Sequence, residues 1–371
     1  MTRVAPALAI VTAVVALSSA IARNTAPRAD ERGWDAKAAA SYLDARAEWW
    51  TTWPSAKRDH GTFCISCHTT LPYALARPAL RLVLGEPEPA APETKILGNL
   101  LERARQWRDI EPFYPDQTRG VPKTSESRAI ESVMNALVLA RRDVERGQLS
   151  EEAKTALTNM WALQMKVGPQ SGAWTWLNFG YEPWESPNSP YFGASLAALA
   201  VGSAPDHYAS SPEIQDRLAQ LRAYFQKQFE HESLHNRLVA LWASNAVTDL
   251  LTADQRRAAT EQAFALQQAD GGWSSPSLGP YKRGDNTPNE TGTDGYATAL
   301  AVLALQCGGV SATDPRVTKG LEWLRRNQDR ATGRWLAASL NKTRDPDSDP
   351  GKFMSDAATA YAVLALTVQA K

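Results

Sequence analysis

The sequence predicts an all-α protein whose helices close into an (α/α)6 toroid. From residue 34 onward the apolar residues recur with helical periodicity, and no segment shows the period-two alternation of a strand. A small-residue, almost wholly apolar helix recurs along the chain, and amphipathic helices with one charged face lie between its copies. Such repetition is typical of helix pairs stacked in one domain, not of independent domains.

The overall composition narrows the class of protein. The 371 residues include 40 Lys and Arg and 40 Asp and Glu, so the formal net charge is zero. A nucleic-acid coat or a polybasic membrane-surface protein needs an excess of positive charge. Hydrophobic residues make up 43% of the chain, which is ample for a core and excludes wholesale disorder. Three cysteines are too few for a disulfide scaffold.

Residues 1–22 have the features of an export signal. Arg3 precedes an apolar stretch, and Ala20-Ile21-Ala22 offers a small-x-small cleavage pattern. An uncleaved membrane anchor is the alternative, because residues 4–22 could just span a bilayer. In both cases we expect the folded part in the periplasm or otherwise outside the cytoplasm. Residues 23–33 are expected to form a polar linker, and residues 34–371 a single toroid.

Six helix pairs are predicted in order along the chain. The amphipathic outer helices are residues 35–53, 92–110, 151–164, 212–229, 253–267 and 315–327. Their apolar inner partners are residues 71–84, 129–140, 192–201, 234–243, 294–305 and 356–366. A helix that is apolar all round is buried on every side. An open solenoid of the same pairs is the alternative, but it would leave a large apolar face exposed, so we favour the closed ring.

Three turns that follow outer helices resemble those of a known family. Gln267-Gln-Ala-Asp-Gly-Gly-Trp273 matches the Q-x3-G-x-W turn of squalene-hopene cyclases and related terpene cyclases. Residues 328–335 are a version one residue longer, and residues 170–174 are a degenerate one. The resemblance covers residues 90–371 and implies the fold of that family, in which the Trp stacks and the Gln bonds to the neighbouring helix end.

The chemistry of that family is not implied. Its Asp-x-Asp-Asp acid motif does not occur in this chain, and the nearest acidic run, residues 345–350, contains prolines and is predicted to be a loop. The Asp-x-Cys and His zinc set of the related protein prenyltransferases is also missing. Terpene cyclase activity is therefore not expected, and the resemblance is one of fold.

The sharpest chemical signal is Cys64-Ile-Ser-Cys67-His68. Two thiols three positions apart can each add to a vinyl group of haem, and the adjacent imidazole then becomes an axial ligand of the iron. The pattern resembles the attachment motif of c-type cytochromes and implies one covalent haem c, held by Cys64 and Cys67, with His68 on the metal. Export supports this interpretation independently, because bacterial haem c is attached outside the cytoplasm.

Two other interpretations of the same residues stay open. His60, Cys64, Cys67 and His68 are four possible zinc ligands close together in the chain. A redox-active Cys-x-x-Cys pair or a plain disulfide is the other interpretation, although no βαβ pattern surrounds the two cysteines.

We expect the haem near the first inner helix, because residues 69–80 have the features of that helix's start. The other loops that enter inner helices, residues 120–127, 172–191, 271–293 and 340–355, should gather at the same mouth of the ring. Their aromatic residues either form an apolar box around the porphyrin or pack the loops themselves. These residues are Trp174, Trp176, Phe179, Tyr181, Trp184, Tyr191, Tyr281 and Phe353.

The sixth iron ligand has several candidates. Met354 precedes the sixth inner helix, which adjoins the first in a closed ring, and His60 lies four residues before Cys64. His207 and an empty position are the other possibilities. A Met or His ligand indicates electron transfer, whereas an empty position indicates ligand or peroxide chemistry.

Three carboxylates are candidates for a catalytic role in the central cavity. Glu131 lies inside an apolar helix, where a buried carboxylate needs a partner such as Arg128. Asp294 and Asp356 occupy equivalent helix starts, where capping is the alternative to a role in the cavity. Cys307 ends an apolar helix and is expected to be an inert buried thiol.

The sequence thus predicts an exported monohaem c-type cytochrome on a toroid. It would serve electron transfer or a haem-dependent redox step, with a redox partner protein or a small-molecule redox substrate. The alternative is an exported toroid enzyme that acts on a hydrophobic or carbohydrate substrate in the central cavity, the haem being auxiliary. A scaffold that presents helix ends to a partner protein is a third possibility. No nucleic-acid partner is expected, and membrane contact only through an uncleaved N-terminal segment.

Overall fold

The computed structural model describes residues 33–116 and 123–368. Within these ranges the regular structure is helical, and the β-type pairs are two isolated bridges, Lys57 with Phe63 and Tyr181 with Glu185. None of the described helices has the length and apolar character needed to cross a membrane. The predicted export signal or anchor, residues 1–22, lies outside the described residues, as does the predicted linker up to residue 32.

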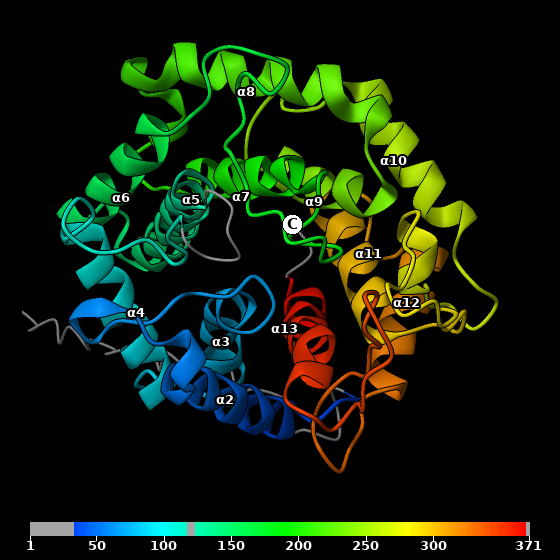
Figure 1. The fold of residues 1–371 in the computed structure, drawn as a ribbon. Helices are drawn as coiled ribbons and strands as arrows, with labels where there is room; N and C mark the ends of the chain where they lie inside the picture. The colour runs from blue at the N-terminus through cyan, green and yellow to red at the C-terminus, as the bar shows by residue number, and fades with distance from the viewer. Residues whose placement is uncertain (1–32, 117–122, 369–371) are drawn as a thin grey trace, which may run out of the picture.

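Six helices surround the centre of the ring. They are α3 (Thr70–Leu84), α5 (Thr124–Asp143), α7 (Ser189–Ser203), α9 (Leu234–Ser244), α11 (Gly295–Cys307) and α13 (Phe353–Thr367). Each packs against the next, and α13 packs against α3, so the ring is closed (Figure 1). Every residue of α7 from Tyr191 to Val201 is buried, as expected for a helix apolar all round. The predicted all-α toroid is confirmed, and the open solenoid is wrong.

Six more helices cover the outside of the ring (Figure 1). They are α2 (Ala36–Thr52), α4 (Ala91–Arg105), α6 (Glu151–Ala162), α8 (Gln215–Gln228), α10 (Ala253–Ala265) and α12 (Pro315–Arg326). Short 3-10 helices lie in the connections, at Pro54–Ala56, Asp59–Gly61, Val144–Arg146, Tyr208–Ser210, Pro212–Ile214, Phe229–His231, Ser275–Leu278 and Pro350–Lys352. The outer helix predicted to reach residue 110 ends at Arg105. Arg128 accounts for the early end, because it binds the carbonyls of Trp107 and Ile110 in the turns that follow.

The glutamine–tryptophan turns join neighbouring outer helices. After α10, Gln267 donates from Nε2 to the carbonyls of Gly271 and Arg316, both at 2.8 Å. Trp273 donates from Nε1 to the Ala263 carbonyl at 2.6 Å, so the end of the turn is bonded to the helix that precedes it, α10. Because Arg316 lies in the first turn of α12, the Gln267 amide links the end of one outer helix to the start of the next.

The turn after α12 makes the same link across the ring closure. The Gln328 Oε1 accepts from the Asp35 backbone N–H at 2.7 Å, and Nε2 donates to the Asp35 carbonyl at 2.9 Å. Asp35 is the N-cap of α2, where its side chain accepts from the Ala38 N–H. The last outer helix is thereby bonded to the first, although 293 positions separate the two residues in sequence.

The third turn uses a different glutamine from the predicted one. Gln164 donates to the carbonyls of Gly172 and Arg217 at 2.9 and 3.0 Å, while Gln170 accepts from the Tyr224 hydroxyl. Residues between Gln164 and Gly172 form an excursion closed by backbone hydrogen bonds of Met165 with Ala173 and Gly172. The motif's fixed spacing therefore led to the wrong residue, because the excursion lengthens the interval before the glycine.

Replacing Gly333 by alanine should destabilise the protein through the ring closure. Its φ is +81°, and an added Cβ would lie 2.2 Å from the Ala38 carbonyl oxygen in α2. Gly309 has a similar φ of +95° but nothing within 4 Å, so Gly309→Ala tests the backbone strain alone. We expect a loss of about 1 kcal/mol for Gly309→Ala and about 3 kcal/mol for Gly333→Ala, measured by urea unfolding. Equal losses in the two variants would contradict a close contact at the closure.

Candidate functional site

A cavity of about 250 Å³ lies at the end of the ring where inner helices begin. Its wall comes from the segment before α3, residues 113–114, the loop before α7 and the loop before α13. The end of α2, with Trp50 and Trp53, and Ile130 of α5 complete the wall. The predicted gathering of loops at one mouth is confirmed for residues 172–191 and 340–355, whereas no lining residue comes from 123–127 or 271–293. Residues 120–122 of the remaining predicted loop lie outside the described residues.

Cys64, Cys67 and His68 all line this cavity. Local hydrogen bonds hold the motif as a compact turn: the Ser66 Oγ accepts from the backbone N–H groups of Thr69 and Thr70, both at 3.1 Å. A serine that accepts from the first N–H groups of a helix favours helix formation there, so α3 begins directly after the motif.

Neighbouring helices fix the position of the motif. The Trp50 Nε1 of α2 donates to the Cys64 carbonyl at 2.7 Å. Asn99 of α4 pairs with the backbone of Phe63, accepting from its N–H at 2.8 Å and donating to its carbonyl at 3.0 Å. The segment that carries the two thiols is thus bonded to the first two outer helices.

Burial controls the ionisation of the motif. It raises the pKa of Cys64 to about 11 and raises the pKa of Cys67 well above its ordinary value. Burial, helped by the positive charge of Arg46, lowers the pKa of His68 to about 3. At neutral pH both thiols are therefore protonated and the imidazole is neutral, which is the form that can bind a metal.

Aromatic rings and one hydrogen bond surround the imidazole of His68. It stacks on Phe353, with ring centroids 3.9 Å apart, and meets the edge of Trp50 at 5.1 Å. Its Nδ1 lies 2.8 Å from the Thr69 Oγ1. Among the residues that the structure describes, none hydrogen-bonds to Nε2.

The aromatic wall differs in part from the predicted one. Of the eight predicted residues, Tyr181, Trp184 and Phe353 line the cavity. Trp174 is buried in the core and donates to the Met160 carbonyl, which is the role of tying the repeat. The sequence analysis missed four aromatic residues that line the cavity, Trp50, Trp53, Phe113 and Tyr114. A signal existed for the first two, because a spacing of three places both on one face of a helix end.

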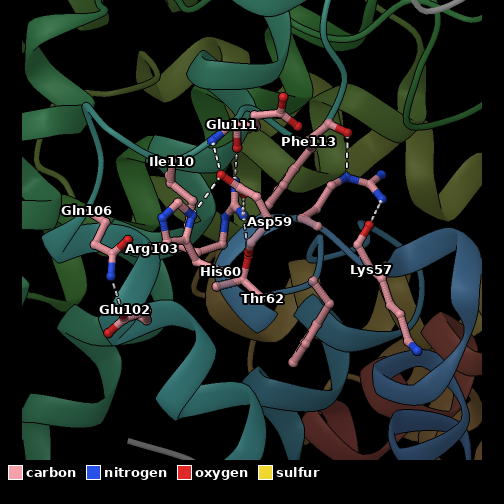
Figure 2. A network of polar contacts seen from close by, with 12 residues as sticks. Lys57, Asp59, His60, Thr62, Glu102, Arg103, Gln106, Ile110, Glu111 and Phe113 are labelled. Atoms are coloured by element: carbon pink, nitrogen blue, oxygen red, sulfur yellow. Dashed lines mark hydrogen bonds and ion pairs between the residues drawn. The ribbon is translucent and has the colours of Figure 1, made fainter.

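Of the candidate sixth ligands, the structure brings Met354 to the cavity that His68 lines. His60 and His207 do not line it. His60 is exposed in the 3-10 helix Asp59–Gly61, and its Nδ1 lies 2.9 Å from the Asp59 Oδ2 (Figure 2). The four-residue zinc set is therefore not assembled, and no group of three or more His, Cys, Asp or Glu within 33–116 and 123–368 could hold a metal ion. Cys64 and Cys67 are not joined by a disulfide.

Glu131 is paired with Arg103, not with Arg128. The Arg103 Nε donates to the Glu131 Oε1 at 2.6 Å, and both side chains are fully buried. Arg103 also donates to the Thr62 Oγ1 at 2.7 Å, next to Asp59 (Figure 2). Burial raises the pKa of the Glu131 carboxyl, and the Arg103 charge opposes that rise. The pair lies outside the cavity and links α4 and α5 to the segment that precedes Cys64.

The two aspartates at helix starts are not equivalent. Asp294 caps α11, accepting from the N–H groups of Tyr296 and Ala297 at 2.9 and 3.0 Å. Asp356 lies inside the first turn of α13, because that helix begins earlier, at Phe353. Neither lines the cavity, and Asp356 accepts from side chains of other elements. Cys307 is only half-buried, because it is the last residue of α11.

Charged residues that the sequence analysis missed also line the cavity. They are Glu182, Glu185 and Arg344. The two glutamates lie in a short hairpin, in which the Glu185 N–H and carbonyl pair with Tyr181 at 2.7 and 2.9 Å. Burial raises the pKa of the Glu182 carboxyl. No motif marked these residues in the sequence, since all three lie in loops without helical periodicity.

The fold is shared with solved structures, although no protein-family model matches the chain and no curated relative was found. The α-1,6-mannanase GH76A of Salegentibacter sp. HEL1_6 has a TM-score of 0.52 at 11% identity, covering 89% of this chain and 100% of the mannanase. An inactive variant of the same enzyme in complex with α-1,6-mannotriose has a TM-score of 0.53 at 10% identity, with the same coverage.

A terpene cyclase is also among the similar structures. The type II terpene cyclase MstE from Scytonema has a TM-score of 0.46 at 14% identity, covering 90% of this chain and 98% of the cyclase. At such low identity the mannanase comparison shows the fold and not an activity. The chain thus shares its fold with the mannanase, and the closed ring of paired helices described above makes that fold an α/α toroid.

Proposed function

We propose that the protein is an exported monohaem c-type cytochrome, with haem bound through Cys64 and Cys67 and its iron bound by His68. The observation that carries this proposal is that both thiols and the imidazole line one cavity, at the start of the first inner helix. A metal or disulfide role for a Cys-x-x-Cys pair does not require the following histidine to face the same space, whereas haem attachment does.

The residues of the cavity fit a haem in three respects. The donor set is that of the attachment motif, and the Nε2 of His68 has no hydrogen-bond partner in the described part of the chain. The walls supply aromatic surface from Trp50, Trp184 and Phe353, which suits a flat apolar ring system. Bound there, the haem would supply one-electron redox chemistry.

Other lining residues have defined roles in this proposal. Met354 is 4% exposed and shares the cavity with His68, so it would be the second protein ligand of the iron. Two protein ligands on the iron are typical of electron transfer. Arg344 is the one permanent cation among the described lining residues, and its guanidinium matches the carboxylate of a haem propionate.

Replacing both Cys64 and Cys67 by serine should abolish covalent haem attachment. The chain is to be exported in a host with working haem-attachment machinery, and haem measured by intact mass and by the pyridine–alkali spectrum. We expect one haem per chain in the parent protein and none in the double variant, because no thiol remains to form a thioether. Cys307→Ser is the matched control and should keep its haem, since Cys307 does not line the cavity. A parent protein with the mass of the bare chain would overturn the proposal.

A second candidate is an exported enzyme that acts on a hydrophobic or carbohydrate substrate in the same cavity, with the haem auxiliary. The specific observation is that Glu182 and Glu185 line the cavity beside aromatic rings. Paired carboxyl groups supply general acid and base catalysis, and a raised pKa keeps one carboxyl protonated nearer to neutral pH. The mannanase, which shares this fold, is an example of a toroid protein that acts on a carbohydrate.

The Glu182→Gln and Glu185→Gln variants separate the two functions. If the cavity is catalytic, each variant should lose about 100-fold or more in turnover while haem content stays unchanged. α-1,6-Mannotriose is the first probe: its hydrolysis measures turnover, and the fluorescence of the cavity tryptophans measures its binding. Glu261→Gln, on the exposed face of α10, is the control and should behave as the parent protein. Full activity in both cavity variants would remove the catalytic carboxylates from consideration.

A further inference from the structure

We infer that Thr69 and Asp356 are positioning residues that fix His68 as the tautomer with a proton on Nδ1 and a free lone pair on Nε2. The binding of iron by that lone pair rests on the proposed function. The hydrogen-bond chain itself is a property of the polypeptide and can be tested without haem.

Three residues form a continuous chain behind the imidazole. The His68 Nδ1 lies 2.8 Å from the Thr69 Oγ1, and that hydroxyl donates to the Asp356 Oδ2 at 2.7 Å. Thr69 is 2% exposed and Asp356 is 1% exposed, so water does not compete for these bonds. Asp356 comes from the last inner helix, so this arrangement exists only when the ring is closed.

Counting protons assigns the direction of each bond. A threonine hydroxyl has one proton, and here the Asp356 carboxylate accepts it. The Thr69 oxygen can then only accept from His68, so Nδ1 must carry the imidazole proton. A neutral imidazole has one N–H, and Nε2 is therefore the unprotonated nitrogen.

The carboxylate is held as an acceptor by two further groups. Arg46 of α2 donates from Nε to both oxygens of Asp356, at 2.9 and 3.1 Å, and the Tyr42 hydroxyl donates to Oδ1 at 2.7 Å. Arg46 is itself oriented by Asp349, whose Oδ1 accepts from it at 2.7 Å. Burial raises the pKa of the Asp356 carboxyl, and the Arg46 charge and these hydrogen bonds oppose that rise. In this arrangement Oδ2 still accepts the proton of the Thr69 hydroxyl.

When the nitrogen that does not bind the metal donates a hydrogen bond, the bond fixes the orientation of the histidine ring and raises the basicity of the ligating nitrogen. Asp356 acts through Thr69 in this way, while Phe353 and Trp50 hold the two sides of the ring. A more basic imidazole stabilises oxidised iron relative to reduced iron. The chain of hydrogen bonds should therefore lower the reduction potential of a haem bound at His68.

The first test uses the full chain produced without haem-attachment machinery. Two-bond ¹H–¹⁵N correlation spectra report which nitrogen of each histidine carries the proton. We expect His68 as the Nδ1-protonated tautomer in the parent protein, and a rise of about fivefold or more in the other form in Thr69→Val, as one buried hydrogen bond is lost. Thr69→Ser should restore the parent pattern.

The second test measures the reduction potential of the haem-loaded variants. Thr69→Val should shift the potential to more positive values, whereas Thr69→Ser should stay near the parent value. An Nε2-protonated His68 in the parent protein would overturn the inference without any variant, as would a Thr69→Val protein with unchanged tautomer and potential. A fixed tautomer in a chain that never acquires haem would uphold the positioning role and remove the proposed cytochrome.

Discussion

The buried ion pair between Arg46 and Asp356 joins the first outer helix to the last inner helix and lies beside the site. Arg46 belongs to the first outer helix and Asp356 to the last inner helix, and the carboxylate also accepts from Thr69 beside the cavity. Removing two charges from water costs several kcal/mol per ion, and this cost is offset only where further hydrogen bonds complete the pair. Tyr42 and Asp349 supply those bonds. Ring closure and the orientation of His68 therefore depend on the same interaction.

A second buried ion pair holds the other end of the motif. Arg103 binds Glu131 and also the hydroxyl of Thr62, two positions before Cys64. Asp356 binds the hydroxyl of Thr69, directly after His68. The motif thus lies between two threonines, each bonded to a buried charge. Fully satisfied polar networks of this kind rigidify a segment, and a rigid segment is what a covalent cofactor site requires.

The toroid explains how a short contiguous motif can lie beside a cavity in a large protein. Inner helices are covered on all sides, so the loops at their N-terminal ends are the part of the ring that can vary in chemistry. The loop before α7 supplies Glu182, the loop before α13 supplies Arg344, and the first turn of α13 supplies Met354 to the same cavity as His68. Both candidate functions use this mouth, and they differ in whether the iron or the carboxylates do the chemistry. The mannanase comparison bears on the architecture alone, because identity is 11%.

The sequence by itself determined the helices and their order. Apolar periodicity located all six inner helices and, within a few residues, the outer ones, because burial of an all-apolar helix admits few arrangements. It also located Cys64, Cys67 and His68, since the motif is contiguous. Only the tertiary structure decided the partners. Glu131 pairs with Arg103 and not with Arg128. Gln164, not Gln170, makes the bonds of the third glutamine–tryptophan turn. Asp356 accepts from Thr69 beside His68 and does not cap its helix. Such choices depend on which side chains meet across the closed ring, and distances between segments far apart in the chain are not encoded in local spacing.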